Sequence, residues 1–197
     1  MPPYQRSYSW GEREALDLLG DLAEATDSNI PHFIGAIVLV NGAESGMVEI
    51  VDGQQRLTTL TILLAVLRDL EPDKERAAAL HAMIADDPRP MLGEAANWRL
   101  TLNYMDGAFF RDTIQRLGAT KTLRNEPGES DSQQRMVGNA SALLKELKQM
   151  PDERRHALTD TVVTGCALVR VVVNDKDQGF KVFRVLNTRG KEPDAHD

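Results

Sequence analysis

Two of the most apolar runs of the sequence are separated by five residues, the glycine Gly53 and the polar residues Asp52, Gln54, Gln55 and Arg56. The run before them is typical of a strand, and the run after them is typical of a helix. The first turn of a helix has unpaired N–H groups and a partial positive charge of about +0.5, so it can accept an anion such as phosphate. Gly53 would let the backbone approach a ligand, and the Arg56 guanidinium suits phosphate oxygens.

The other side chains of this block extend the same chemistry. Gln54 and Gln55 can each donate and accept hydrogen bonds, so either could orient a water molecule, a base or a ribose. Asp52, at the C-terminal end of the strand, could bind Mg²⁺ through water or accept a proton. The alternative is structural: Asp52 caps the helix, Gly53 forms a turn, and the two glutamines lie in an exposed first turn.

A second candidate is the N-terminal segment, in which Tyr4, Arg6, Tyr8 and Trp10 alternate. In an extended segment these side chains would project from one side. Aromatic rings interleaved with arginine can bind DNA through stacking and cation–π contacts. Tyr4, Gln5 and Arg6 are therefore candidates for sensing DNA or another ligand. Tyr8 and Trp10 could instead pack on the core and tether the N-terminus.

A third candidate follows the last predicted helix, at Asn187, Arg189 and Gly190. Arg189 could pair with a phosphate, and Asn187 could bind a nucleotide edge or Asp52. The alternative is a helix C-cap, in which Gly190 ends the helix and Arg189 complements its negative end. The charged run at 152–156, in contrast, is expected to be a solvated helix face and not a binding patch.

The composition limits the class of protein. The chain has 197 residues, 42% of them hydrophobic, which suffices for one large domain or a domain with an insertion. The net charge of −7 disfavours a surface devoted wholly to nucleic acid but allows a local basic patch. A single cysteine, Cys166, permits no internal disulfide and no cysteine-rich zinc site. No run approaches the roughly 18 apolar residues of a membrane span, so we expect a cytoplasmic protein without membrane contact.

Hydrophobic periodicity predicts an α+β fold. Predicted strands lie at 33–40, 47–51 and 166–173, and predicted helices at 11–26, 54–70, 73–85, 94–117, 135–149, 152–161 and 177–190. The first two strands should be antiparallel across a turn at 41–46, and residues 118–134 should form a mobile loop. This layout predicts a small sheet from both ends of the chain (core about 1–72 and 162–197) with a large helical insertion at about 73–161.

Four blocks carry a resemblance to a known family. They are PPYQRSYSW, HFIGAIVLV, EIVDGQQRLTTLTILLAVL and FKVFRVLNTRGKEP. In this order and at similar spacing they resemble the N-terminal domain of GmrSD-type restriction endonucleases, bacterial anti-phage enzymes that act on modified DNA. The resemblance covers essentially the whole chain and implies a small, mixed, ParB/sulfiredoxin-like sheet with a helical insertion. Members carry a C-terminal HNH-type nuclease domain, and we expect neither that domain nor a nuclease active site in this chain.

The resemblance also implies an activity, because nucleotide binding and NTP hydrolysis with a divalent cation are attributed to the DGQQR block. It assigns Asp52, Gln54, Gln55 and Arg56 to catalysis, Asp52 to the metal, and Gly53, Arg56, Asn187, Arg189 and Gly190 to an NTP of unknown identity with Mg²⁺. Arg184 stands where many members have an acid, which could weaken turnover.

We therefore expect an NTP-binding and NTP-hydrolysing regulatory domain of a modification-dependent DNA restriction system. Its expected partners are modified DNA and an HNH-type nuclease, on a C-terminal domain or a separate chain, with a homo-oligomer left open. The alternative is a non-catalytic, nucleotide-switched module that binds DNA or a partner protein.

Overall fold

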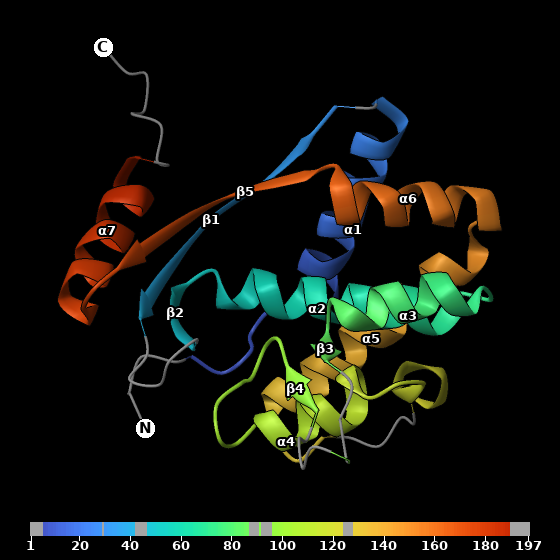
Figure 1. Cartoon of the computed structure of the whole chain (residues 1–197), viewed down its shortest axis with the longest axis horizontal. Helices are drawn as coiled ribbons and strands as arrows, with labels where there is room; N and C mark the ends of the chain where they lie inside the picture. The colour runs from blue at the N-terminus through green and yellow to red at the C-terminus, as the bar shows by residue number, and fades with distance from the viewer. Residues whose placement is uncertain are drawn as a thin grey trace. The chain divides into compact units, whose positions relative to one another are not determined.

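The computed structural model describes residues 6–28, 30–41, 47–86, 91, 96–123 and 128–189, without the side chains of 186–189. Tyr4, Gln5, Gly190 and the side chains of Asn187 and Arg189 lie outside the described residues, as does most of the turn predicted at 41–46. The chain divides into two compact units (Figure 1). The described residues of Arg6–His32 and Gln55–Cys166 form the helical unit, and those of Phe33–Gln54 and Ala167–Asp197 form the sheet unit.

The sheet unit contains three strands in the order β2-β1-β5. Their bounds are His32–Asn41 for β1, Val48–Asp52 for β2 and Cys166–Val173 for β5. β1 and β2 are antiparallel, as predicted, with Leu39 opposite Ile50. The arrows of β1 and β5 point the same way in Figure 1, so the sheet is mixed. The predicted α+β class is confirmed, whereas the ParB/sulfiredoxin likeness and the division into core and insertion stay predictions.

Helix α7 (Lys176–Arg189) packs on this sheet through a glycine. A Cβ at Gly179 would lie 3.2 Å from the Val51 side chain and 3.3 Å from that of Val40. Glycine costs about 1 kcal/mol relative to alanine inside a helix, but here it allows the helix backbone to approach the strands closely. Lys176 Nζ adds an ion pair to Glu49 Oε2 at 2.7 Å.

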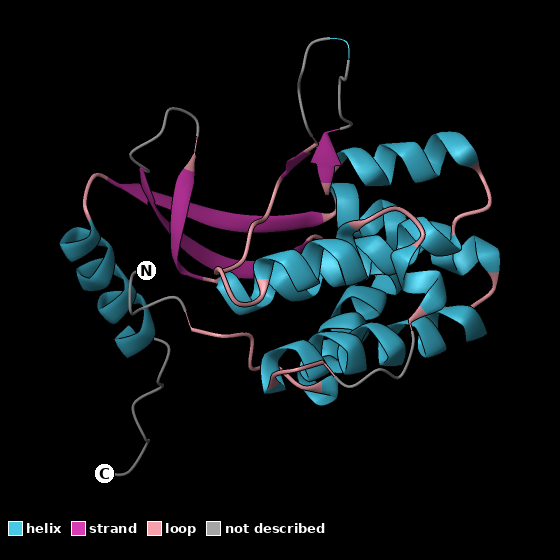
Figure 2. Cartoon of the chain, turned by 90° about the horizontal axis from the view of Figure 1, so that it is seen from below, coloured by secondary structure: helices cyan, strands magenta, loops and turns pink. Residues whose placement is uncertain are grey.

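The helical unit is built mainly of helices, which are drawn in cyan in Figure 2. Its longer helices are α1 (Glu12–Ser28), α2 (Gln54–Leu70), α3 (Lys74–Ala82), α5 (Asp131–Gln149) and α6 (Asp152–Thr164). Helix α1 packs on α5 and α6, and its buried residues are Ala15, Leu18, Leu19, Leu22 and Ala25. No helix in the described part of the chain has both the length and the apolarity that a bilayer span requires.

The helix predicted at 94–117 is wrong. Its first residues include strand β4 (Asn97–Trp98), which pairs with β3 (Ala85–Asp86), and helix resumes only with α4 (Gly107–Phe110) and a π-helical turn at Arg111–Gln115. The side chain of Asn103 contributes to this break, because its Oδ1 accepts from the backbone N–H groups of Met105 and Asp106, both at 3.0 Å. Such bonds give the backbone an alternative to helix.

The prediction of a mobile loop at 118–134 is also wrong for the described residues of that range. A 3-10 turn spans Ala119–Thr122, and α5 begins as early as Asp131. Thr120 is fully buried, and its N–H and hydroxyl both donate to Asp69 Oδ2, at 3.0 and 2.7 Å. The fixed position of this turn therefore depends on a carboxylate 51 residues away in the sequence.

Arg68 and Asp69 form a buried ion pair near the end of α2, with Arg68 Nε 2.7 Å from Asp69 Oδ1. The Arg68 guanidinium also donates to the carbonyls of Gln115 at 2.6 Å and Arg116 at 2.8 Å. Burial alone would raise the pKa of Asp69, but hydrogen bonds from Arg68 and Thr120 and the charge of Arg68 hold that pKa below its usual value. The pair thus links α2 to the irregular segment after the π-helical turn.

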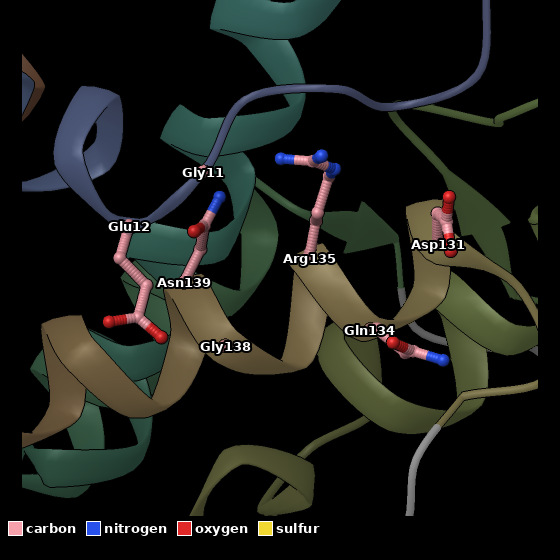
Figure 3. Close-up of a pocket in the computed structure, with 7 residues that line it drawn as sticks. All are labelled: Gly11, Glu12, Asp131, Gln134, Arg135, Gly138 and Asn139. Carbon is pink, nitrogen blue, oxygen red and sulfur yellow. The ribbon is translucent and has the colours of Figure 1, made fainter.

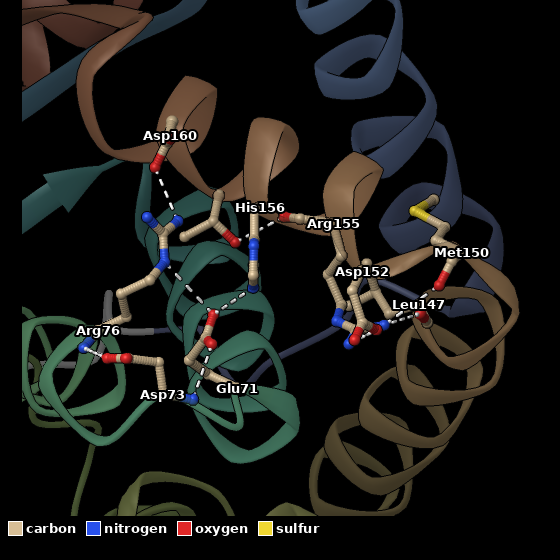
Figure 4. Close-up of polar contacts among 10 residues, drawn as sticks. Glu71, Asp73, Arg76, Leu147, Met150, Asp152, Arg155, His156 and Asp160 are labelled. Carbon is tan, nitrogen blue, oxygen red and sulfur yellow. Dashed lines mark hydrogen bonds and ion pairs between the residues drawn. The ribbon is translucent and has the colours of Figure 1, made fainter.

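The charged run at 152–156 is not a wholly solvated helix face, which corrects that prediction (Figure 4). Arg155 is 8% exposed. Its guanidinium donates to Asp152 Oδ1 at 2.6 Å and to the carbonyls of Met150 at 3.2 Å and Leu147 at 3.3 Å. This arginine therefore links the end of α5 to the start of α6 through hydrogen bonds.

A second polar cluster in Figure 4 surrounds the buried carboxylate of Glu71. His156 Nε2 lies 3.2 Å and Arg76 Nε 3.5 Å from Glu71 Oε2, while the Asp73 N–H donates to Oε1 at 3.0 Å. Arg76 also pairs with Asp160 at 2.9 Å. The cluster fixes the α2–α3 connection to α6.

Replacing Arg68 by methionine tests the role of the buried pair. Arg68→Met leaves Asp69 buried without its cation, so we expect a loss of about 3–5 kcal/mol in the free energy of unfolding. Urea denaturation followed by circular dichroism measures it. The matched control is Arg13→Met, which removes an exposed pair with Asp17 at 3.8 Å and should cost less than about 1 kcal/mol. Equal losses in the two variants would contradict the structure.

Candidate functional site

The chain passes from β2 into α2 through one residue. Asp52 is the last residue of β2 and Gln54 the first of α2, so Gly53 alone makes the turn. Its φ of +92° lies in the region that L side chains rarely adopt, and an added Cβ would lie 2.6 Å from Ile37 Cγ2. Glycine is therefore required here by the neighbouring strand, independently of any ligand.

The first turn of α2 differs from those of the other long helices in the described residues, because it contains no acidic residue. The acids in the other first turns are Glu12 and Glu14 in α1, Glu75 in α3, Asp131 in α5, Asp152 and Glu153 in α6, and Asp177 in α7. Acidic side chains in a first turn offset the positive end of the helix dipole. In α2 that turn instead contains Arg56, so it suits an external anion.

The five residues of the block do not belong to one compact unit. Asp52, Gly53 and Gln54 group with the sheet unit, and Gln55 and Arg56 with the helical unit. All five are half-buried. One of the covalent connections between the two units therefore runs through the block itself.

Gln55 uses both ends of its side-chain amide to hold the N-terminal segment. Its Oε1 accepts from the N–H of Ser9 at 2.7 Å and from that of Trp10 at 3.3 Å. Its Nε2 donates to the Ser7 carbonyl at 3.2 Å. The amide thus binds the backbone of an extended segment 45 to 48 residues earlier in the chain.

Tyr8 anchors the same segment in the core of the helical unit. It is 3% exposed, its hydroxyl lies 2.7 Å from Thr59 Oγ1, and Asn139 Nδ2 donates to it at 2.6 Å. Burial raises the pKa of this phenol, although the two hydrogen bonds act against the shift. Asn139 also donates to the Trp10 carbonyl at 3.0 Å. The tether alternative is confirmed for Tyr8, while Arg6, one residue outside the anchor at Ser7, is exposed.

Sequence reasoning missed Asn139 as a partner of the N-terminal segment. The signal was present, since asparagine competes with the backbone for hydrogen bonds and is disfavoured inside helices. Asn139 nevertheless occurs within the predicted helix at 135–149.

For metal binding, the described residues contain no group of three or more His, Cys, Asp or Glu side chains that could hold an ion.

Together these features define an α+β domain in which a glycine turn leads from an edge strand into a helix whose first turn suits an anion. The whole chain, residues 1–197, matches the family described as the GmrSD restriction endonuclease, N-terminal domain, and it belongs to that family. A comparison with curated proteins found no match. The chain is therefore a domain of a restriction endonuclease system, which acts on DNA together with a nuclease domain.

Alanine substitutions at two glycines separate the effect of backbone strain from that of the contact with β1. Gly118 has a φ of +78° with no atom within 4 Å of an added Cβ, whereas Gly53 also meets Ile37. We expect Gly118→Ala to cost about 1–2 kcal/mol from strain alone. Gly53→Ala should cost about 1–3 kcal/mol more from the added contact. Thermal denaturation of both variants measures this difference, and equal costs would mean that the contact with Ile37 is absent.

Releasing the N-terminal segment tests the role of Gln55. Gln55→Ala removes the bonds to Ser7, Ser9 and Trp10, so we expect faster tryptic cleavage after Arg6 and about 1–2 kcal/mol of lost stability. Mass spectrometry of timed digests follows the cleavage. Gln149→Ala, at the exposed end of α5, is the control and should be cut at the wild-type rate. An unchanged rate in Gln55→Ala would show that this amide does not hold the segment.

Proposed function

We propose that this domain binds a nucleoside triphosphate at the start of α2 and hydrolyses it to regulate a DNA restriction nuclease. The observation that carries the proposal is the first turn of α2, which contains no acidic residue, contains Arg56, and follows a strand through a single glycine. Membership of a restriction endonuclease family supports a role in DNA restriction. The proposed target is modified DNA, with the nuclease on a C-terminal domain or a separate chain.

In this proposal the phosphates are held by the helix N–H groups and by Arg56, whose planar guanidinium matches phosphate oxygens. Gly53 makes the turn that leads directly into these N–H groups. Either Gln54 or Gln55 is proposed to position the attacking water, and the amide of Gln55 also bonds to the N-terminal segment. Asn187, Arg189 and Gly190, at and beyond the end of α7, are proposed to bind the rest of the nucleotide.

The chemistry needs a proton acceptor and a metal ligand, and Asp52 is proposed for one of these two roles: it binds Mg²⁺, or it orients the attacking water and accepts its proton. Mg²⁺ in such sites is usually bound by one or two carboxylates together with the substrate phosphates, and it neutralises phosphate charge. A single half-buried carboxylate fits that requirement better than a preformed cage, and the described residues contain no cluster of three metal-binding side chains. When Asp52 takes the second role, water attacks the γ-phosphorus, the bond to the bridging oxygen breaks, and Asp52 accepts the proton of the water.

A phosphate-release assay with ATP, GTP, CTP and UTP, each with Mg²⁺, tests hydrolysis. We expect release with at least one nucleotide, loss of release in Asp52→Ala, and weaker nucleotide binding in Arg56→Ala. A ligand at 100 times its dissociation constant adds about 2.7 kcal/mol, which corresponds to roughly 5–10 °C in melting temperature. No release and no thermal shift with any nucleotide would remove the proposal.

The second candidate is a nucleotide-switched module that binds DNA or a partner without turnover. It is favoured by the bonds of Gln55 to the backbone of the N-terminal segment, because a ligand in the same first turn of α2 could act as a switch on that attachment. A thermal shift without phosphate release, together with DNA binding that changes with nucleotide, would support this candidate over the hydrolase. Sensing of DNA by Tyr4, Gln5 and Arg6 belongs to both candidates.

A further inference from the structure

The helical unit has an open depression between the start of α1 and the first half of α5 (Figure 3). The exposed, charged side chains of Glu12, Asp131 and Arg135 line it. Exposed charges of both signs are well solvated, so this surface requires no partner. The sheet unit has a surface of a different kind, because its strand β5 is both apolar and exposed.

Strand β5 has the composition of a buried strand without the burial. Its sequence, CALVRVVV, contains one charged residue, Arg170. Leu168, Val169 and Val172 are nevertheless 43%, 49% and 44% exposed. Residues 167–170 are all exposed, and successive side chains point to opposite faces, so both faces of β5 are exposed. Strands that are apolar on both faces are normally buried on both.

β5 also lies at an edge of the sheet. In the part of the chain that the structure describes, β1 is its neighbour on one side and no strand follows on the other. An edge strand presents unpaired N–H and C=O groups, which proteins usually protect with short strands, proline or lysine. β5 has eight residues and neither proline nor lysine. The opposite edge, β2, has five residues, which include Glu49 and Asp52. β5 is therefore the edge that suits pairing with a further strand.

The exposure of both faces indicates what covers β5. A helix or loop packed on the sheet would cover one face and leave the other exposed. A strand about 4.8 Å away would pair with the backbone of the edge and place its side chains beside those of β5 on both faces. That strand must itself be apolar on both faces. Of the two edge strands that the structure describes, β5 meets this condition, and β2, with its carboxylates, does not. The occupant that fits is β5 of a second copy.

The charge of Arg170 limits the register of such a pair. In an antiparallel pair related by a two-fold axis, one residue lies opposite its own copy. A pair centred on Arg170 would place two guanidinium groups opposite each other, and like charges in that position are destabilising. A pair centred on Val169 places Arg170 opposite Leu168 of the second copy. A pair centred on Val171 would leave Leu168 beyond the paired residues.

We propose that β5 pairs antiparallel with β5 of a second copy of this chain, with the pair centred on Val169. The two sheets then form one sheet in the order β2-β1-β5-β5-β1-β2. This pairing occupies both β5 edges and leaves the charged β2 strands outermost, so assembly stops at two copies. The dimer does not depend on a nucleotide at the start of α2.

Light scattering of the full chain after size-exclusion chromatography tests the dimer. At high micromolar concentration we expect twice the mass of one chain, and serial dilution gives the dissociation constant. A chain that stays monomeric at high micromolar concentration, or that forms assemblies larger than a dimer, overturns the proposal.

The matched variants are Val169→Lys on β5 and Val48→Lys on β2. They change equally exposed valines, 49% and 48% exposed, on opposite edges of the sheet. Val169→Lys places two ammonium groups opposite each other and removes apolar burial, so the dissociation constant of the dimer should rise at least about tenfold. Val48→Lys should leave it unchanged. Equal dissociation constants in the two variants, or a larger effect of Val48→Lys, overturn the assignment to β5.

Hydrogen exchange of the wild-type chain tests the pairing without a substitution. The outward-facing backbone amides of β5 should exchange more slowly in the concentrated dimer than in the diluted monomer, because the second strand accepts hydrogen bonds from them. The amides of β2 should exchange at the same rate in both states. Exchange of β5 that is equally fast at both concentrations overturns the proposal.

Discussion

The turn at Gly53 is the constraint on which the junction between β2 and α2 depends. Because one residue makes the whole turn, the last carboxylate of the strand and the first N–H groups of the helix are only a few bonds apart. The contact with Ile37 leaves no room for a side chain at the turn. The same turn places Gln55 in the first turn of α2, from which it reaches the backbone of the N-terminal segment. Any ligand at this junction meets a backbone whose geometry the fold has already set.

Buried polar side chains hold the parts of the helical unit that have no regular structure. Asn139 and Thr59 bond to the hydroxyl of Tyr8 and so fix an extended segment. Arg68 and Asp69 do the same for the irregular chain after the π-helical turn. Each contact joins residues that are far apart in the sequence, and each satisfies groups that would otherwise be costly to bury. Irregular segments thereby gain fixed positions without forming an apolar core of their own.

Hydrophobic periodicity and turn residues correctly predicted those helices and strands whose formation depends on neighbouring residues in the sequence. The helix predicted at 54–70 is α2, and the antiparallel pair of strands was predicted from two β-branched apolar runs around a turn signal. The prediction failed at 94–117 and 118–134, where side chains compete with helix or where a distant carboxylate fixes a turn. The candidate site divides in the same way. The polar residues between two apolar runs were enough to predict the position of the block. The role of Gln55 could not be predicted, because it depends on backbone groups about 46 residues away in the sequence.

The anchor on the N-terminal segment bonds largely to main-chain atoms, namely the N–H groups of Ser9 and Trp10 and the carbonyls of Ser7 and Trp10. Main-chain atoms are the same for almost every amino acid, so positions 7 and 9 can change identity without loosening the attachment. Related proteins could therefore diversify this strip of surface and adapt it to new targets while the scaffold beneath it keeps its form.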